Sequence, residues 1–458
     1  MAKTTLPPAN GMSSFWRSSP GALDDYRSTE SLPAECDVLI VGAGYSGASL
    51  ITHFLSQAES ANKSFVILEA RQLCSGASGR NGGHCKPDPY NVASSAARIF
   101  GVKAGAEIAE FEIANLNAIK EYVRETGVDC DFNVTQAVDV QLSVEHNEAL
   151  KARYDEFIAN GGEVAKTAFY TPRKDAEMIS GIKGAKGVYK YTTAHLWPYK
   201  LIHHMFTHAL TFSNVNLQTH TPALSIPSSQ SPDGTWPVTT PRGTIRARTI
   251  IIATNAYTAA LLPEYQDKII PYRTICSRIV TPGPSMPPLL NNSYALRFNE
   301  LDFDYLIPRT DGSIIVGGAR RTYLRDLDEW YGNVDDSKII EKGKNYFDGY
   351  MQRYFRGWED SGAYTEQVWA GIMGYSSDQF PRIGPVPGRQ NMFIMGGFTG
   401  HGMPQIFLAA KGLSEMVLKD VPFENTGIPS LFKESRARLE SKENFALDMH
   451  RRVKESKL

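Results

Sequence analysis

An apolar run, a glycine-rich turn and a second apolar run follow one another near the start of the chain. Residues 38–41 are wholly apolar and predict a short buried strand, and the turn Gly42-Ala-Gly-Tyr-Ser-Gly47 follows at once. Residues 48–56 can begin a helix, and the second apolar run, Phe65–Leu68, ends in Glu69. We therefore expect a strand–helix–strand unit at this point.

Each glycine of the turn has a separate structural task. Gly42 permits the tight turn, Gly44 lets a pyrophosphate approach the backbone, and Gly47 lets the helix pack closely on the strand. A helix that begins here directs free N–H groups and its dipole at an anion. Glu69 ends the second run, where a carboxylate can accept hydrogen bonds from ribose hydroxyls. The pattern predicts a site for the ADP half of a dinucleotide.

Related patterns recur further along the chain. The β-rich run Thr249–Ile252 is typical of a buried parallel strand. A short apolar strand over 391–395 precedes a glycine-rich turn and a helix, which we expect to open at Gly400 and Gly402 and to end at Lys419. The other predicted elements are helices over 93–126, 144–160 and 335–355, strands over 134–142, 271–280 and 295–298, and a hairpin of 304–307 with 314–316.

Nucleotide-type elements thus stand at the start, in the middle and near the end, with β-rich insertions between them. We predict an α/β fold: a discontinuous Rossmann-like cofactor domain, interleaved with an α+β substrate domain on a mixed or antiparallel sheet. An extended arm, which Ser14-Phe-Trp16 could anchor, precedes these domains, and a tail follows them. The predicted ranges are 1–34 for the arm, 35–98, 191–265 and 366–424 for the cofactor domain, 99–190 and 266–365 for the substrate domain, and 425–458 for the tail.

Composition narrows the class of protein. Apolar residues make up 42% and charged residues 21% of the chain, and the net charge is −1, which argues for a soluble globular protein and against a nucleic-acid partner. No apolar run approaches the ~20 residues of a membrane span, and we see no signal peptide. The five cysteines are scattered without a CxxC pair, which favours free thiols.

Two further patterns bear on location and on metals. Ser456-Lys457-Leu458 matches the peroxisomal address, so we expect a peroxisomal protein and the import receptor as a partner. His203, His204 and His208 share helical spacing, and the last two could bind zinc as an i, i+4 pair. No HExxH motif or cysteine pair accompanies them. We therefore expect a helix face there, and no metal site.

Several separated motifs carry a family likeness. They are the glycine turn with Glu69, the loop Ser75-Gly-Ala-Ser-Gly-Arg-Asn-Gly-Gly83, the strand end Ala253-Thr-Asn255, the segment 374–388, and Gly397-Phe-Thr-Gly-His-Gly402. Together they resemble the D-amino-acid oxidase superfamily of flavoproteins, in the branch of glycine, sarcosine and gamma-glutamylputrescine oxidases. The resemblance covers roughly residues 14–420, and the cofactor that it implies is FAD.

The resemblance also implies which residues contact FAD. Ser78 and Arg80 could reach the pyrophosphate, as a hydroxyl and a bidentate donor. The amides of Gly400 and Gly402 would face the pyrimidine carbonyls of the flavin and stabilise negative charge on it. The full predicted set is Gly42, Gly44, Tyr45, Ser46, Gly47, Glu69, Ala70, Arg71, Ser75, Ser78, Arg80, Asn81, Gly82, Gly83, His84, Leu224, Ala253, Thr254, Asn255, Gly371, Gly400, His401, Gly402 and Met403.

Three residues are candidates for the catalytic centre. His84 and His401 sit inside cofactor motifs and would lie near the flavin ring, and Tyr305 lies on the predicted hairpin. A lone histidine is more often structural, so each could also be a packing residue. His84 or Cys85 could attach the flavin covalently. The cysteine that carries this link in some relatives corresponds to Gly371, so that particular linkage is not expected.

The expected reaction is oxidation of the C–N bond of an amine or amino-acid-like substrate, with hydride passing to the flavin and O2 reduced to H2O2. Two departures qualify the resemblance: Pro404 replaces a lysine that binds the substrate carboxylate, and Ile315 replaces an oxygen-activating lysine. Arg309 and Arg320 flank the hairpin and could meet a polar substrate group, although surface positions are the default. The alternatives are an FAD-dependent dehydrogenase with another electron acceptor and a non-catalytic flavin-binding protein.

Overall fold

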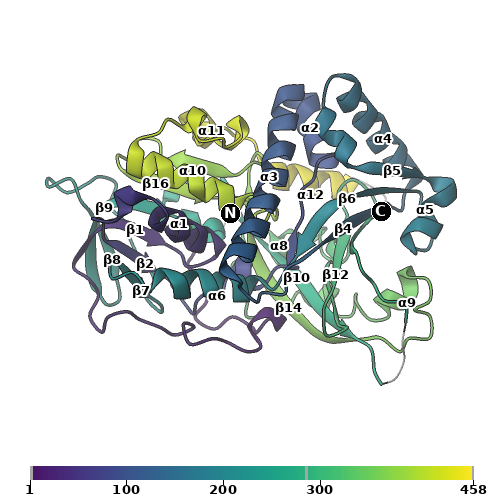
Figure 1. Cartoon of the computed structure of the whole chain (residues 1–458), viewed down its shortest axis with the longest axis horizontal. Helices are drawn as coiled ribbons and strands as arrows, with labels where there is room; N and C mark the ends of the chain where they lie inside the picture. Colours follow the sequence, from purple (N-terminus) through teal and green to yellow (C-terminus); the bar gives the residue numbers. More distant parts are fainter. Residues whose placement is uncertain (1–3, 284–286, 456–458) are drawn as a thin grey trace.

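The computed structural model of the 458-residue chain describes residues 4–283 and 287–455. Two β-sheets stand side by side in Figure 1, with the long helix α3 (Val102–Thr126) between them. Ser456-Lys457-Leu458, the predicted peroxisomal address, lies outside the described residues. In the described ranges, no helix is both long and apolar enough to cross a membrane.

The first sheet holds the strand–helix–strand unit predicted from the sequence. In the part of the chain that the structure describes, it has seven strands, with β1 paired in parallel to both β2 and β9. The order is β15-β16-β9-β1-β2-β7, and β8 pairs with β9. The strands are β1 (Glu35–Val41), β2 (Phe65–Leu68), β7 (Val215–Gln218), β8 (Trp236–Thr240), β9 (Gly243–Ile252), β15 (Arg382–Pro385) and β16 (Met392–Gly396).

The second sheet is mixed, as predicted for the substrate domain. Among the described residues it has nine strands in the order β14-β10-β13-β12-β11-β4-β6-β3, with β5 on β6. Its neighbours pair antiparallel except β11 and β4, which run parallel. The strands are β3 (His84–Cys85), β4 (Asn133–Gln141), β5 (Phe169–Pro172), β6 (Gly187–His195), β10 (Ile269–Val280), β11 (Ser293–Arg297), β12 (Phe303–Pro308), β13 (Ile314–Gly318) and β14 (Tyr364–Ser376).

Two predicted domain boundaries fall inside strands of this second sheet. Position 191 lies within β6, which pairs with β4 along its whole length, and position 366 lies within β14, at a bulge with paired residues on both sides. The chain therefore leaves the second sheet, and returns to the first, only after His195 and after Ser376. The alternation of the two sheets along the chain still interleaves them as the sequence predicts.

The helices pack around these sheets. Helices α1, α6 and α10 share one apolar core with the first sheet. The helices are α1 (Tyr45–Leu55), α2 (Asn91–Phe100), α3 (Val102–Thr126), α4 (Val144–Ala159), α5 (Arg173–Ser180), α6 (Pro198–Ala209), α7 (Thr258–Leu261), α8 (Leu327–Trp330), α9 (Tyr350–Tyr354), α10 (Ile406–Lys419), α11 (Arg436–Glu440) and α12 (Phe445–Glu455).

Two helix predictions were wrong in extent. The single helix expected over 93–126 is two helices, α2 and α3, because Gly101 adopts a positive φ of 92° between them. The helix expected over 335–355 is reduced to a 3₁₀ turn at Glu341–Gly343 and the short α9. Gly349, with a positive φ of 65°, comes directly before α9, so the backbone leaves the helical region there.

The N-terminal arm is anchored where the sequence predicts. Trp16 is fully buried, and its indole Nε1 donates a hydrogen bond to the carbonyl of Asn81. Ser14 donates its hydroxyl to the carbonyl of Gly79, in the same loop. Arg309 lies 5.1 Å from the Trp16 ring and pairs with Asp131. The arm is thereby fixed against the loop that carries the Ser-Gly-Arg-Asn-Gly-Gly motif.

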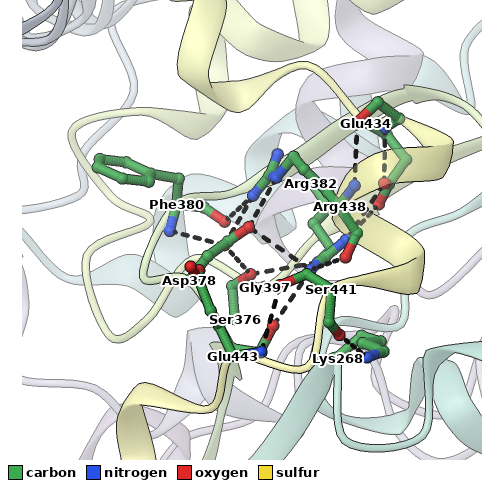
Figure 2. A network of polar contacts seen from close by, with 12 residues as sticks. Lys268, Ser376, Asp378, Phe380, Arg382, Gly397, Glu434, Arg438, Ser441 and Glu443 are labelled. Carbon is green, nitrogen blue, oxygen red and sulfur yellow. Dashed lines mark hydrogen bonds and ion pairs between the residues drawn. The ribbon is translucent and has the colours of Figure 1, made fainter. Parts of the chain in front are cut away.

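The C-terminal segment is folded onto the body rather than extended as a tail. Figure 2 shows Arg438 of α11 on the carboxylate of Asp378, with N–O distances of 2.8 Å to each oxygen. Arg382 pairs in the same cluster with Glu434, and neither side chain is exposed. Beyond the cluster, α12 buries Met449 in the core of the second sheet. The last helix is thus part of the domain.

Candidate active site

A cavity of about 950 Å³ is lined by residues from both sheets. The glycine turn, the end of β2, the loop after β9 and the segment before α10 meet there, although some 360 residues separate the first from the last. All predicted site residues line this cavity except Gly47, Ser75, Gly83 and Leu224. The sequence motifs therefore form one site.

The glycine turn has the geometry that a bound diphosphate requires. Gly42 has a φ of 114°, and a Cβ there would lie 2.7 Å from the carbonyl oxygen of Ala253. Ser78 accepts a hydrogen bond from the amide of Tyr45, the first residue of α1, at 3.0 Å. Its hydroxyl thus stands at the helix N-terminus, where an anion is favoured. A Cβ on Gly44 would lie 3.1 Å from the same hydroxyl, so Gly44 keeps this space open.

Glu69, the residue predicted to contact a ribose, is held in place by two backbone donors. One carboxylate oxygen accepts the amide of Ala43 at 2.9 Å, and the other accepts the amide of Arg71 at 3.0 Å. These backbone donors fix the side chain at the end of β2, where it lines the cavity. The carboxylate keeps lone pairs for hydroxyl donors of a ligand.

The four predicted residues outside the cavity act through the backbone or lie apart from it. A Cβ on Gly47 would overlap the carbonyl oxygen of Gly42, so Gly47 serves helix–strand packing as predicted. The carbonyl of Ser75 accepts hydrogen bonds from two arginines, and Gly83 packs against Trp16 with a φ of 75°. Leu224 is 43% exposed, and its neighbour Ala223 lines the cavity in its place.

Arg80 lines the cavity, and its guanidinium is held by several protein partners. Its guanidinium donates to the carbonyls of Ser75 at 2.7 Å and Ala370 at 3.0 Å. Asp336, which is fully buried, lies 3.2 Å from Arg80 and accepts two hydrogen bonds from Arg71 at 2.8 and 2.9 Å. A buried guanidinium needs such partners to offset its lost hydration.

The glycine–histidine–glycine segment also departs from its prediction. Helix α10 begins at Ile406, so Gly400 and Gly402 precede it rather than open it. The carbonyl of Gly402 accepts the amide of Ile406 at 2.9 Å, in the turn that leads into the helix. Gly400, with a φ of 78°, turns the chain so that His401 faces the cavity. The Nε2 atom of His401 lies 3.1 Å from the buried carboxylate of Glu112.

His84 and Tyr305 meet in the cavity wall. Their rings are perpendicular, with centroids 5.4 Å apart. Burial, followed by the nearby charge of Lys86, lowers the pKa of His84 to about 3, so the imidazole is neutral at physiological pH. The Tyr305 hydroxyl lies 3.3 Å from the sulfur of Cys276. Cys85, the other residue considered for covalent attachment, is buried, does not line the cavity, and has a raised pKa because of burial.

Arg320 lines the cavity with a cationic side chain, although a surface position was the default expectation from the sequence. Its guanidinium donates to the hydroxyl of Tyr375 at 2.6 Å and lies 4.8 Å from the centre of the Phe303 ring. Its neighbour Arg321 pairs with Asp302 at 2.6 Å, whereas no described carboxylate forms an ion pair with Arg320. An unmatched guanidinium in a cavity is a site for an anionic group of a ligand.

Other polar residues of the cavity were also missed. Lys86 pairs with the buried Asp139 at 2.7 Å. The guanidinium of Arg297 lies 5.1 Å from the centre of the Phe303 ring, which Arg320 also contacts. Lys86, Arg297 and Phe303 all line the cavity. They lie outside every motif, and only the pairing of distant strands brings them to the site.

Comparison with known proteins identifies the family. A family model described as FAD dependent oxidoreductase matches residues 37–416. The chain belongs to the FAD-dependent oxidoreductase family. Gamma-glutamylputrescine oxidoreductase of Escherichia coli (strain K12), a relative of this oxidoreductase, is 23% identical over 407 residues, or 84% of each chain.

Two glycine oxidases show the same likeness. Glycine oxidase of Bacillus licheniformis is 21% identical to this oxidoreductase over 395 residues, covering 83% of this chain and 93% of the relative. The crystal structure of glycine oxidase from Geobacillus kaustophilus matches the fold with a TM-score of 0.69 at 18% identity, over 88% of this chain and 99% of that one. The predicted family and its mixed α/β fold are therefore confirmed.

The cofactor of the family is FAD, and the residues of this oxidoreductase fit it. The turn at Gly42 and Gly44, the N-terminus of α1 and the carboxylate of Glu69 would hold the ADP half. The remainder of the cavity, around Gly371 and His401, would hold the flavin half. Across the described ranges no group of three potential metal ligands is found, and the five cysteines are free and buried.

Proposed function

We propose that this oxidoreductase oxidises the C–N bond of an amine that carries a carboxylate, and that O2 reoxidises the flavin to give H2O2. The observation that carries the proposal is Arg320, which faces the cavity without a carboxylate partner among the described residues. The names of two relatives, gamma-glutamylputrescine oxidoreductase and glycine oxidase, support a substrate that combines an amine with a carboxylate.

Arg320 and Tyr375 would bind the carboxylate. A guanidinium offers two parallel N–H donors to a carboxylate, and such charge-assisted pairs are strong and directional. Tyr375 holds one end of the guanidinium by accepting its hydrogen bond at 2.6 Å. Phe303 covers a face of the same group. The substrate would thus be held at one end, which limits how the C–N bond can lie.

His84 and Tyr305 would line the place of the amine. Since the pKa of His84 is lowered to about 3, chiefly by burial, this residue adds no positive charge that would repel an ammonium group. Its Nε2 atom is buried and has no hydrogen-bond partner among the described residues, so the neutral imidazole can accept a hydrogen bond from the amine. FAD, when bound, supplies the hydride acceptor.

A dehydrogenase with another electron acceptor is the second candidate. Ile315, the residue at the position of the oxygen-activating lysine, is fully buried and apolar in β13. The described structure therefore offers no cation at that position. The apolar Ile315 favours an electron acceptor other than O2. It does not affect the proposal about the amine substrate.

A visible spectrum of the purified protein and a matched substrate panel test the proposal. Each carboxylated amine is paired with its decarboxylated counterpart, and flavin bleaching is followed without air. The proposal expects bleaching by carboxylated members and peroxide on admission of air. Bleaching without peroxide, with turnover restored by an artificial acceptor, would favour the dehydrogenase. A flavin that no amine bleaches would contradict both.

A further inference from the structure

Helix α3 carries two fully buried polar residues that grip the segment before α10. Glu112 and Asn115 stand three residues apart and therefore share a face of the helix. Asn115 donates to the carbonyl of Met403 at 3.2 Å and accepts the amide of Leu408 at 2.9 Å. Its contacts fix the backbone of this segment and carry no net charge.

Glu112 makes a different set of contacts. It accepts the amide of Asp88 at 2.8 Å and the side-chain amide of Gln405 at 2.7 Å. Its third neighbour is His401, with 3.1 Å between Nε2 and the carboxylate oxygen. A buried carboxylate needs such donors in place of water. The Glu112 carboxylate therefore lies directly behind His401, held by donors from two other segments.

His401 is the part of this pair that meets the cavity. Its side chain is 32% exposed, against 0% for Glu112, so the carboxylate lies in the wall and the imidazole in front of it. Burial opposes protonation of His401, but the attraction of Glu112 outweighs it and raises the pKa. Asp88 adds to the increase and Lys86 acts against it.

We propose that Glu112 is a positioning residue that keeps His401 as an imidazolium directed into the cavity, where its positive charge stabilises negative charge on the flavin. The proposal rests on the cavity being used by the flavin as in the proposed function. It assigns to Glu112 a task that its place in the middle of α3 did not indicate. The pair is an oriented dipole with its positive end towards the ligand.

Sulfite is a suitable probe because it adds reversibly to oxidised flavin and leaves negative charge on the ring without substrate turnover. The FAD-loaded Glu112→Gln variant keeps the shape of the side chain and loses its charge. We expect it to bind sulfite about tenfold more weakly than the wild type at pH 7, as for the loss of one nearby charge. His401→Gln should show the same loss. The double variant should bind no more weakly than His401→Gln alone, because the two residues act as one unit.

Asn115→Ala is the matched control, because it loosens the same segment from the same helix without changing a charge. Its sulfite affinity should stay within about twofold of the wild type. An equal loss in Asn115→Ala and Glu112→Gln would show a structural effect and overturn the proposal. So would a Glu112→Gln variant that binds sulfite like the wild type.

The pH dependence gives a readout that does not require Glu112→Gln to fold. Sulfite itself titrates in the neutral range, so the readout is the difference between the pH profiles of the wild type and His401→Gln. Relative to His401→Gln, sulfite affinity of the wild type should fall as the pH rises through the pKa of His401. The charged groups that face His401 are Glu112, Asp88 and Lys86, and pH profiles of the same shape in the two proteins would overturn the proposal. A protein that binds FAD but oxidises no amine would contradict only the proposed function, since sulfite binding needs no turnover.

Discussion

The guanidinium of Arg320 donates a 2.6 Å hydrogen bond to the hydroxyl of Tyr375, and both side chains line the cavity. This pair predicts how substrates will be discriminated. In Arg320→Met, kcat/KM for a carboxylated amine should fall about 10- to 100-fold, because a hydrogen bond to a charged group contributes about 1.5–3 kcal/mol. The kcat/KM of Arg320→Lys should lie between those of the wild type and Arg320→Met, since lysine keeps the charge without the planar pair of donors.

The decarboxylated counterpart of the same amine is the internal control for Arg320. Its kcat/KM should change little in Arg320→Met, because it has no anionic group for the guanidinium to bind. Steady-state kinetics with the two amines measure this difference. Equal losses for both would mean that Arg320 shapes the cavity rather than binds a carboxylate.

We predict that removing the Asp336 carboxylate strongly lowers the free energy of unfolding. Asp336→Ala would leave Arg71 and Arg80 buried without their shared carboxylate, and breaking a buried pair in this way costs about 3–5 kcal/mol. Urea unfolding of the FAD-loaded protein measures the loss. Asp335→Ala is the control, because its carboxylate is partly exposed and pairs with the exposed Lys338, and it should cost under about 1 kcal/mol. Similar losses in both variants would count against the buried pairing.

Gly47→Ala predicts a packing defect at the nucleotide turn. The added Cβ would overlap the carbonyl oxygen of Gly42, so α1 must move from β1, and overpacking of this kind costs about 1–3 kcal/mol. FAD affinity and the unfolding midpoint should both fall. Gly76→Ala is the matched control for the unfolding midpoint, since an added Cβ there meets no protein atom within 4 Å; because Gly76 lines the cavity, it is not used as a control for FAD affinity. A normal FAD affinity in Gly47→Ala would show that the turn tolerates the shift.

Asp378 predicts a pH-dependent contribution to stability. Burial opposes its ionisation, but Arg438 and Arg382 outweigh it and lower its pKa from the ordinary 3.8 to about 2. Because the folded state has the lower pKa, this carboxylate stabilises the fold above pH 3.8, and the contribution is lost as the pH falls towards 2. The contribution is about 2 kcal/mol for a shift of this size.

Urea unfolding at a series of pH values measures that contribution. The free energy of unfolding of the wild type should fall more steeply between about pH 5 and pH 2 than that of Asp378→Asn. Arg438→Gln should flatten the same slope from the other side of the pair shown in Figure 2. Parallel curves for the wild type and Asp378→Asn would rule out this source of acid sensitivity.

Local patterns predicted the nucleotide-binding part of the fold well. The strand at β1, the turn at Gly42 and the terminal Glu69 lie within one short stretch, so their spacing alone specifies the unit. The helix predicted over 335–355 does not form over its whole length. Side chains at its start make local hydrogen bonds to the backbone, and the spacing of apolar residues does not reveal them. The Asn333 and Asp335 side chains accept the amides of Asp335 and Ser337, and this favours turns.

The site was predictable only as far as it is built from motifs. Glu112, Arg320 and Asp336 lie in no motif, and their roles arise from contacts with residues up to about 290 positions away. Arg320 and Arg321 are adjacent and identical in type, yet one faces the cavity and the other pairs with Asp302. Sequence alone does not separate them, because both lie in the 3₁₀ turn Arg320–Thr322 that follows the left-handed Ala319, and their contacts come from distant parts of the chain.

The order of strands in the first sheet constrains when the protein can acquire its flavin during synthesis. Strand β1 is flanked by β2 and β9, and β9 pairs in turn with β16, which ends at Gly396. His401, Gly402 and Met403, which line the cavity where the flavin would lie, come later still. A nascent chain on the ribosome therefore has its nucleotide turn long before it has a complete pocket. We therefore expect the chain to retain flavin only after it has been synthesised beyond Met403.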